Sequence, residues 1–306
     1  MKRLITIASL FLSLFTSTIS YAEGVISNPE KILIVLTSHT ELGNTGKKTG
    51  FWLPELTHPY YEFTEAGYSV DVASIDGGMA PVDSKAFEEE DEHHRTFLND
   101  ATLMAKVIQS IPLAEVNPND YQVIMFAGGS GPMWDFPDNK DISRISSAIY
   151  ENEGIVSAVC HGNAALINIR LSDGNFLIAD KRIAAFTNEE EESLGTAEIV
   201  PFLLQDKLIE RGAIHAYGKA WEENVVVENR LISGQNPASA KKVAQSIIAL
   251  IEEKAIQQGI KYLRLDCVAH NLKLREYYES CLFQFKGEIN LGEINLALFE
   301  YEISAN

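Results

Sequence analysis

The sequence predicts an α/β fold in which a mostly parallel sheet is covered on both faces by helices. Short apolar runs rich in β-branched residues recur along the chain, as at 31–37, 121–126 and 155–159. Runs of this kind are typical of strands that are buried on both faces. Segments with helical patterning separate these runs, and strands interleaved with helices form parallel sheets.

The remaining elements follow the same alternation. A helix is expected from Pro54 to Gly67, because proline suits the first helical turn and glycine suits the end. A helix at 189–210 is expected to break at Pro201, since a prolyl ring removes a backbone donor and clashes with the preceding turn. The other expected elements are strands at 68–73 and 182–186, helices at 96–111, 141–153 and 237–254, and a hairpin at 225–232 turning at Glu228 and Asn229.

A second, smaller pattern of strands and a helix begins after Lys254. Because it restarts after the last helix of the main alternation, we expect a principal domain at 23–254 and a separate, partial α+β unit at 255–306. The elements expected in this unit are strands at 259–268, 283–285 and 295–302 and a helix at 271–280.

The N-terminus has the layout of a secretory signal peptide, expected at 1–22. Basic Lys2 and Arg3 precede an apolar stretch at 4–15, and the small residues that follow end at Ala22 in an A-x-A-like cleavage site. A membrane anchor would need about 20 apolar residues, more than this stretch supplies. We therefore expect cleavage after Ala22 and a periplasmic or secreted protein with no membrane association afterwards.

The charge and the cysteine count restrict the classes of function. The chain carries a formal net charge of −18, and an acidic surface repels nucleic acid and anionic lipid. Three cysteines, an odd number, do not suit a disulfide-built scaffold and indicate a free thiol with a function. Cys267 and Cys281 remain a possible pair. These observations disfavour a nucleic-acid binder.

The strongest chemical signal surrounds Cys160. The apolar run at 155–159 leads directly into Cys160, His161 and Gly162 and then into helix-forming residues. This pattern is typical of a strand-to-helix elbow, which holds a nucleophile at the carboxyl ends of parallel strands. The positive end of a helix favours the thiolate, so the pKa of Cys160 is expected to be lowered. A buried structural cysteine is the alternative.

The small residues at 127–131, Ala-Gly-Gly-Ser-Gly, end the preceding strand. Residues with little or no side chain let backbone N–H groups approach an oxyanion that develops during a reaction. A tight turn is the simpler alternative. Because the run follows a parallel strand, an oxyanion site beside Cys160 is favoured.

Together these motifs resemble the DJ-1/PfpI superfamily and, within it, the Hsp31-like, glyoxalase III-type class. The resemblance covers about residues 30–252. The motifs that carry it are Thr-Ser-His-Thr at 37–40, the run at 48–56 that ends in Pro-Glu-Leu, His58-Pro59, Ala-Gly-Gly at 127–129, Met-Trp-Asp-Phe-Pro at 133–137, Ala-Val-Cys-His-Gly at 158–162 and Gly-Gln-Asn-Pro-Ala-Ser-Ala at 234–240.

The resemblance implies a flavodoxin-like three-layer sandwich with a Cys-His-acid site. Carried over by motif, Cys160 is the nucleophile, His161 is its neighbour, and Glu55 hydrogen-bonds the sulfur. The backbone amides of Gly129 and His161 form the oxyanion hole. Ser130 departs from the family, in which Hsp31-like proteins often have histidine, and this leaves the details of the substrate open.

The resemblance also implies an acidic partner for His161 in the acidic run that follows Thr187. The spacing from Phe186 and Thr187 favours Glu191, and Glu190 is the alternative. Acidic residues are also favoured in the first turn of any helix, so the run has a purely structural explanation as well.

The function expected from this resemblance is a glutathione-independent glyoxalase that converts methylglyoxal to lactate, with a role in stress and detoxification. The partners expected are a small α-oxoaldehyde and a second copy of the chain, with no cofactor. A cysteine peptidase or amidohydrolase of the PfpI type would use the same residues. A holdase chaperone or a redox sensor is the non-enzymatic alternative.

Four histidines are the candidate metal ligands in a superfamily with some zinc-binding relatives. His58 precedes a proline and is expected to be structural, and His93 and His94 are expected in an acidic loop. The fourth candidate is His39. No metal site is expected from these histidines.

The tail is similar to the C-terminal end of a GNAT acetyltransferase. In that family Tyr278 matches the tyrosine that often protonates the departing CoA thiolate. No pyrophosphate-binding loop precedes it, and Leu282 stands where the family usually has glycine. Without such a loop there is no cradle for acetyl-CoA, so residues 255–306 are expected to be a truncated, inactive remnant.

Overall fold

A computed structural model gives the fold of the chain. The signal peptide expected at 1–22 lies outside the described residues, as does Cys281 and with it the possible pair with Cys267. Within the described part of the chain, no helix combines the length and apolar character that a membrane span requires. The described residues are 31–88, 91–257, 262–280, 283–290, 292 and 295–302.

The principal domain is built on a seven-stranded sheet with the strand order β3-β2-β1-β4-β5-β9-β8. Each neighbouring pair is parallel except β8 and β9, which form the predicted antiparallel hairpin. The central strands β1, β4 and β5 are buried along almost their whole length, as their apolar runs predict. The strands are β1 (Lys31–Leu36), β2 (Ser69–Ser74), β3 (Ile111–Pro112), β4 (Val123–Phe126), β5 (Ile155–Val159), β8 (Val225–Glu228) and β9 (Leu231–Gly234).

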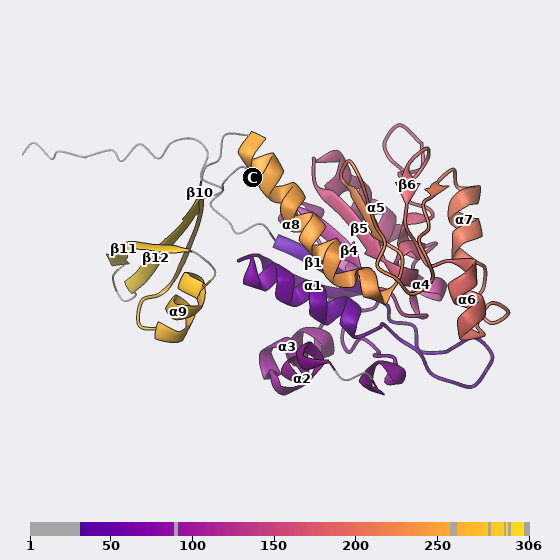
Figure 1. The fold of residues 1–306 in the computed structure, drawn as a ribbon, viewed down its shortest axis with the longest axis horizontal. Coiled ribbons are helices and arrows are strands. Elements are labelled where there is room, and N and C mark those ends of the chain that lie inside the picture. Colours follow the sequence, from indigo (N-terminus) through magenta and orange to yellow (C-terminus); the bar gives the residue numbers. More distant parts are fainter. Residues whose placement is uncertain are drawn as a thin grey trace, which may run out of the picture.

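Helices cover both faces of this sheet. The connections β1–α1–β2 and β4–α5–β5 run in opposite directions along the sheet, so right-handed crossovers place α1 (Pro54–Glu65) and α5 (Lys140–Glu151) on opposite faces. Helix α8 (Ala240–Gln257) packs beside α1, as Figure 1 shows. The predicted flavodoxin-like three-layer sandwich is therefore confirmed.

Residues 195–203 break the helix expected at 189–210, and the break includes Pro201 as predicted. The two helices on either side are α6 (Asn188–Leu194) and α7 (Leu204–Glu210). Smaller elements complete the domain: the short helix α4 (Pro132–Asp135) and a two-stranded parallel sheet of β6 (Arg182–Ile183) and β7 (Ile214–His215).

The single helix expected at 96–111 is wrong. The structure has two helices, α2 (Glu92–Asn99) and α3 (Ala101–Ile108), separated by Asp100. The Asp100 backbone is extended, and its carboxylate accepts hydrogen bonds from two backbone N–H groups at the start of α3. An aspartate in this position ends one helix and caps the next. The loop expected at His93 and His94 is also wrong, because both residues lie in α2.

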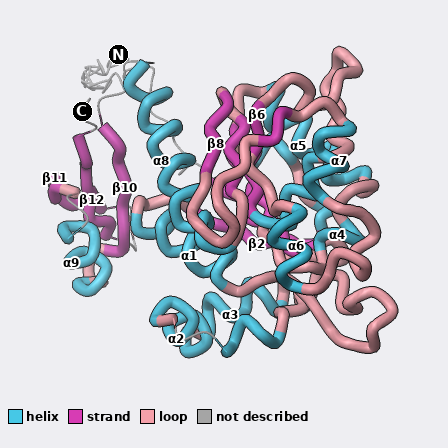
Figure 2. Tube along the Cα trace, turned by 45° about the vertical axis from the view of Figure 1, so that its right-hand side comes forward, coloured by secondary structure: helices cyan, strands magenta, loops and turns pink. Residues whose placement is uncertain are grey.

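The tail forms a second, three-stranded antiparallel sheet with its own small core (Figure 2). Its strand order is β10-β12-β11, and helix α9 follows β10 in the chain. This confirms the small α+β architecture predicted for the tail. The elements are β10 (Tyr262–Val268), α9 (Leu272–Ser280), β11 (Gln284–Asn290) and β12 (Asn295–Glu302), and the core residues are Cys267, Ala269, Phe283, Ala297 and Phe299.

Candidate active site

Cys160 occupies the elbow that the sequence predicts. Strand β5 ends at Val159, and Cys160 has a positive φ of 57° before a 3₁₀ helix continues to Leu166. A left-handed backbone at a non-glycine residue costs on the order of 1–3 kcal/mol. Gly162 makes the turn possible, since a Cβ there would lie 2.3 Å from the Phe126 carbonyl oxygen at the end of β4.

Two backbone amides and one imidazole surround the sulfur of Cys160. The backbone N–H groups of His161 and Gly129 donate hydrogen bonds to Sγ, and Sγ lies 3.5 Å from His161 Nδ1. Gly129 has a φ of 97°, which aims its N–H into the site at little conformational cost. The two amides expected to form the oxyanion hole therefore converge on the predicted nucleophile.

His161 is held on its other side by Glu191. The distance from His161 Nε2 to Glu191 Oε2 is 2.7 Å, and both side chains are buried. Burial raises the pKa of Glu191, but its close contact with His161 and a hydrogen bond from Thr196 bring it below its usual value. A carboxylate accepts and does not donate, so Nε2 carries the proton and Nδ1 faces the sulfur as an acceptor.

Glu190, the alternative partner of His161, has a different role. Its carboxylate accepts hydrogen bonds from the Thr187 backbone at 2.9 Å and the Trp221 backbone at 2.8 Å. It also accepts from Gln235 at 3.1 Å and Asn236 at 2.8 Å, both in the predicted 234–240 motif. Glu190 therefore caps α6 and joins it to two loops, while Glu191 faces the histidine.

Glu55 lies against the cysteine from the first turn of α1. Its side chain is fully buried, and Oε2 accepts a hydrogen bond of 2.7 Å from the Gly128 backbone. A Cβ at Gly128 would lie 2.7 Å from Glu55 Oε2 and 2.9 Å from Cys160 Cβ. Only glycine at this position lets the carboxylate and the cysteine approach each other so closely.

The predicted fall in the pKa of Cys160 is wrong. Burial raises the pKa of the thiol and the Glu55 carboxylate raises it further, and the amides of His161 and Gly129 offset only part of this. The helix that follows is a short 3₁₀ helix, so its dipole is small beside the cost of burying a thiolate next to a carboxylate. The thiol is the resting form at neutral pH.

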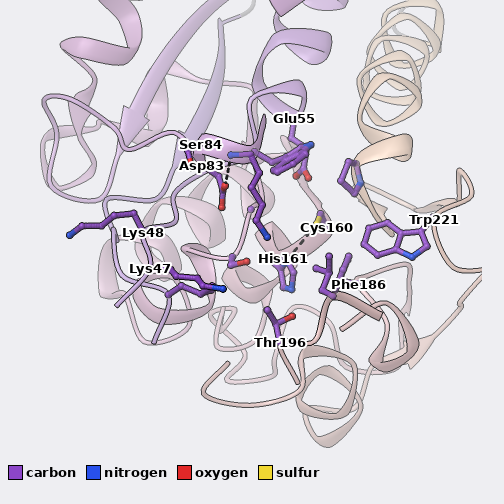
Figure 3. Close-up of a pocket in the computed structure, with 17 residues that line it drawn as sticks. Lys47, Lys48, Glu55, Asp83, Ser84, Cys160, His161, Phe186, Thr196 and Trp221 are labelled. Carbon is purple, nitrogen blue, oxygen red and sulfur yellow. Dashed lines mark hydrogen bonds between the residues drawn. The ribbon is translucent and has the colours of Figure 1, made fainter. Parts of the chain in front are cut away.

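A cavity of about 390 Å³ opens onto these groups. Figure 3 shows Cys160 and His161 at its centre, with Phe186 and Trp221 on one side and Lys47 and Lys48 on the other. Lys47 and Lys48 bring positive charge to this side of the pocket, where Lys48 forms an ion pair with Glu41. The sequence analysis did not identify Lys47 or Trp221, because neither belongs to a recognised catalytic pattern. Further lining residues are Leu42, Trp52, Asp83, Ser84, Lys85, Ser130, Leu194, Thr196 and Pro237.

Comparisons with known proteins identify the family. Residues 48–191 match the model of the DJ-1/PfpI family. Glyoxalase 3 of Candida albicans is 33% identical over 232 residues, covering 72% of this chain and 98% of that protein. The chain belongs to the DJ-1/PfpI family. Another relative of this DJ-1/PfpI protein, glutathione-independent glyoxalase HSP31 of Saccharomyces cerevisiae, is also 33% identical, over 233 residues and with the same coverage of 72% and 98%.

Solved structures agree with this assignment to the DJ-1/PfpI family. Glyoxalase III from Candida albicans matches with a TM-score of 0.69 and 30% identity, covering 73% of this chain and 98% of that one. Rapid Encystment Protein 24 KDa of Francisella tularensis matches with a TM-score of 0.71 and 40% identity, covering 72% and 99%.

A half-buried aspartate, Asp135, supports one wall of this DJ-1/PfpI fold near the site. The Asp135 carboxylate accepts hydrogen bonds from Thr37 Oγ1 and Ser38 N at 2.8 Å and from His39 N at 3.1 Å. It thereby fixes the loop after β1, where His39 stacks on Trp134 with ring centroids 4.9 Å apart. Burial raises the pKa of Asp135 to about 6, although these hydrogen bonds oppose the rise.

The raised pKa of Asp135 predicts a pH-dependent stability. Its ordinary value is 3.8 and its folded value is about 6, so the folded state binds this proton more tightly than the unfolded state. The contribution to the free energy of unfolding is fully present below about pH 4 and is lost as the pH rises through about 6. Asp135→Asn should remove this slope in urea unfolding at pH 4 to 7. The exposed Asp138→Asn is the control, and an unchanged slope in Asp135→Asn would contradict the assignment.

Proposed function

We propose that this protein is a glutathione-independent glyoxalase that converts methylglyoxal to lactate. The observation that carries the proposal is the buried array in which Cys160 lies between Glu55 and the His161–Glu191 pair. Relatives at 33% identity carry the name of this activity. The array supplies a nucleophile, a base and oxyanion donors, which the conversion requires.

The first step is attack of the sulfur on the aldehyde carbon. Because the resting group is a thiol, its proton passes to His161 Nδ1, 3.5 Å away, as the C–S bond forms. No free thiolate then has to persist beside Glu55. The aldehyde oxygen becomes the oxyanion of a hemithioacetal, and the backbone N–H groups of Gly129 and His161 stabilise it.

The second step moves a proton between adjacent carbons. A base removes the hydrogen of the former aldehyde carbon, giving an enediol, and the neighbouring carbon is then protonated. His161 first gives the proton it took from the thiol to the hemithioacetal oxygen and so becomes neutral again. Assisted by Glu55, it then removes the hydrogen of the former aldehyde carbon and delivers it to the neighbouring carbon, since both groups border the sulfur. The product is a lactoyl thioester on Cys160. Water cleaves the C–S bond, releasing lactate and restoring the thiol, so methylglyoxal and one water account for every atom of the product.

The direct test is to incubate the purified protein with methylglyoxal, without glutathione, and to measure lactate. A folded protein that forms no lactate would reject the proposal. Four expectations from the sequence stay predictions. They are export through a signal peptide, a homodimer, a role in stress and the similarity of the tail to an acetyltransferase.

Glu55→Gln is expected to make Cys160 more acidic while it lowers turnover. Removal of the carboxylate removes a charge that raises the pKa of the thiol, so the pH midpoint for alkylation of Cys160 by iodoacetamide should move to lower pH. Mass spectrometry of the alkylated protein measures the midpoint. Glu189→Gln, an exposed acid on α6, is the control. A midpoint in Glu55→Gln that is unchanged or higher would contradict the role assigned to Glu55.

A further inference from the structure

Three side chains of metal-ligating type meet outside the active site, between α1 and α2. They are His58 of α1, Asp91 at the N-cap of α2 and His93 in the first turn of α2. One possible ligand atom from each lies within 4.8 Å of the others. The proposed glyoxalase reaction uses none of these side chains.

The two oxygens of the Asp91 carboxylate contact different groups. Oδ1 caps α2, accepting from the backbone N–H of His93 at 2.7 Å and of His94 at 3.3 Å. Oδ2 faces His58 Nε2 at 2.6 Å.

His93 adds an imidazole with an unused ring atom. The rings of His58 and His93 are nearly perpendicular, with centroids 5.3 Å apart. His93 Nδ1 is buried and has no hydrogen-bond partner within the part of the chain that the structure describes. An unsatisfied buried polar atom costs about 1–3 kcal/mol. A ligand that accepts electrons from this nitrogen would remove that cost.

We propose that His58, Asp91 and His93 form a binding site for a divalent transition-metal ion of the Zn²⁺ type. Two imidazoles and one carboxylate suit Zn²⁺, whereas Ca²⁺ and Mg²⁺ prefer oxygen ligands throughout. The ion replaces the proton shared by His58 and Asp91. Ligand bonds of about 2.0–2.2 Å place neighbouring ligand atoms roughly 3.4 Å apart, so small side-chain movements suffice.

The site joins α1 to the start of α2, so a bound ion is expected to stabilise the contact between these two helices. His58 lies one helical turn after Glu55 on α1. Three protein ligands leave a fourth position for water. Binding to the folded chain stabilises it, so the ion should raise the melting temperature by holding the α1–α2 contact that flanks the Glu55 turn.

The experiment measures Zn²⁺ binding by isothermal titration calorimetry after removal of metals with a chelator. The full protein carries Cys160→Ala, so that the active-site thiol cannot bind the ion. We expect one ion per chain from this site. His58→Gln, Asp91→Asn and His93→Gln should each weaken its binding more than about 100-fold, because loss of an outer partner alone costs about 10- to 100-fold. His270→Gln, an exposed histidine of the tail, is the matched control.

His93→Gln gives the sharpest result because it keeps the helix cap and the His58–Asp91 pair. The rise in melting temperature that Zn²⁺ gives the parent should be lost in this variant, with each protein compared with its own metal-free melting temperature. Equal Zn²⁺ affinity in the parent and all three variants would overturn the proposal, as would a parent that binds no Zn²⁺. Either result leaves the glyoxalase proposal standing, since lactate formation is measured separately.

Discussion

Cys160→Ala is expected to lower kcat/KM for lactate formation from methylglyoxal by at least about 1000-fold, because Cys160 is the only thiol among the described residues that line the pocket and could form the hemithioacetal. The sulfur is the atom on which the backbone amides of Gly129 and His161 converge. Alanine removes that atom and leaves the rest of the array in place. The measurement is lactate formed without glutathione.

Cys267→Ala provides the matched control for this loss. It makes the same chemical change in the separate core of the tail, so the protein should keep its activity. Thermal unfolding of each variant verifies that it is folded. Folded Cys160→Ala that retains a tenth of the parent activity would refute the covalent scheme. Cys160-dependent cleavage of a fluorogenic peptide, with no lactate from the parent, would favour the amidohydrolase instead.

The sheet could be predicted from the sequence because burial on both faces produces a local pattern. The central strands β1, β4 and β5 are apolar at nearly every position, and each was predicted to within two residues at either end. The break at Asp100 between α2 and α3 was missed because it depends on a polar side chain and not on the apolar pattern. Its carboxylate competes with the helix for backbone N–H groups, and the apolar period of the segment does not record that competition.

The site was predictable only where one motif fixes a residue by itself. Cys160 and His161 are adjacent in the chain, so the elbow brings them together. The pKa of Cys160 depends on Glu55, which is remote in sequence and reaches the sulfur through the packing of α1. The approach of His58 to Asp91 likewise follows from packing of α1 on α2 and leaves no trace in the local pattern.

The sequence alone also could not decide which of the adjacent residues Glu190 and Glu191 contacts His161, and the second large predicted effect on activity depends on this choice. Consecutive residues of an α-helix point about 100° apart, so only one of Glu190 and Glu191 can face His161. Glu191→Gln should lower kcat by about 10²- to 10⁴-fold. Its amide can donate to His161 Nε2, which moves the ring proton to Nδ1. That nitrogen could then no longer accept the thiol proton across 3.5 Å. The measurement is kcat for lactate formation.

Glu190→Gln should give the reverse pattern and is the matched comparison. Its carboxylate accepts charge-assisted hydrogen bonds from Trp221 and Asn236 at 2.8 Å. Loss of that charge in a fully buried position should lower the free energy of unfolding by about 2–3 kcal/mol, measured in urea. Its kcat should fall far less than that of Glu191→Gln, although Trp221 lines the pocket and KM can rise. A larger loss of kcat in Glu190→Gln than in Glu191→Gln would show that the 2.7 Å contact between Glu191 and His161 does not set the tautomer.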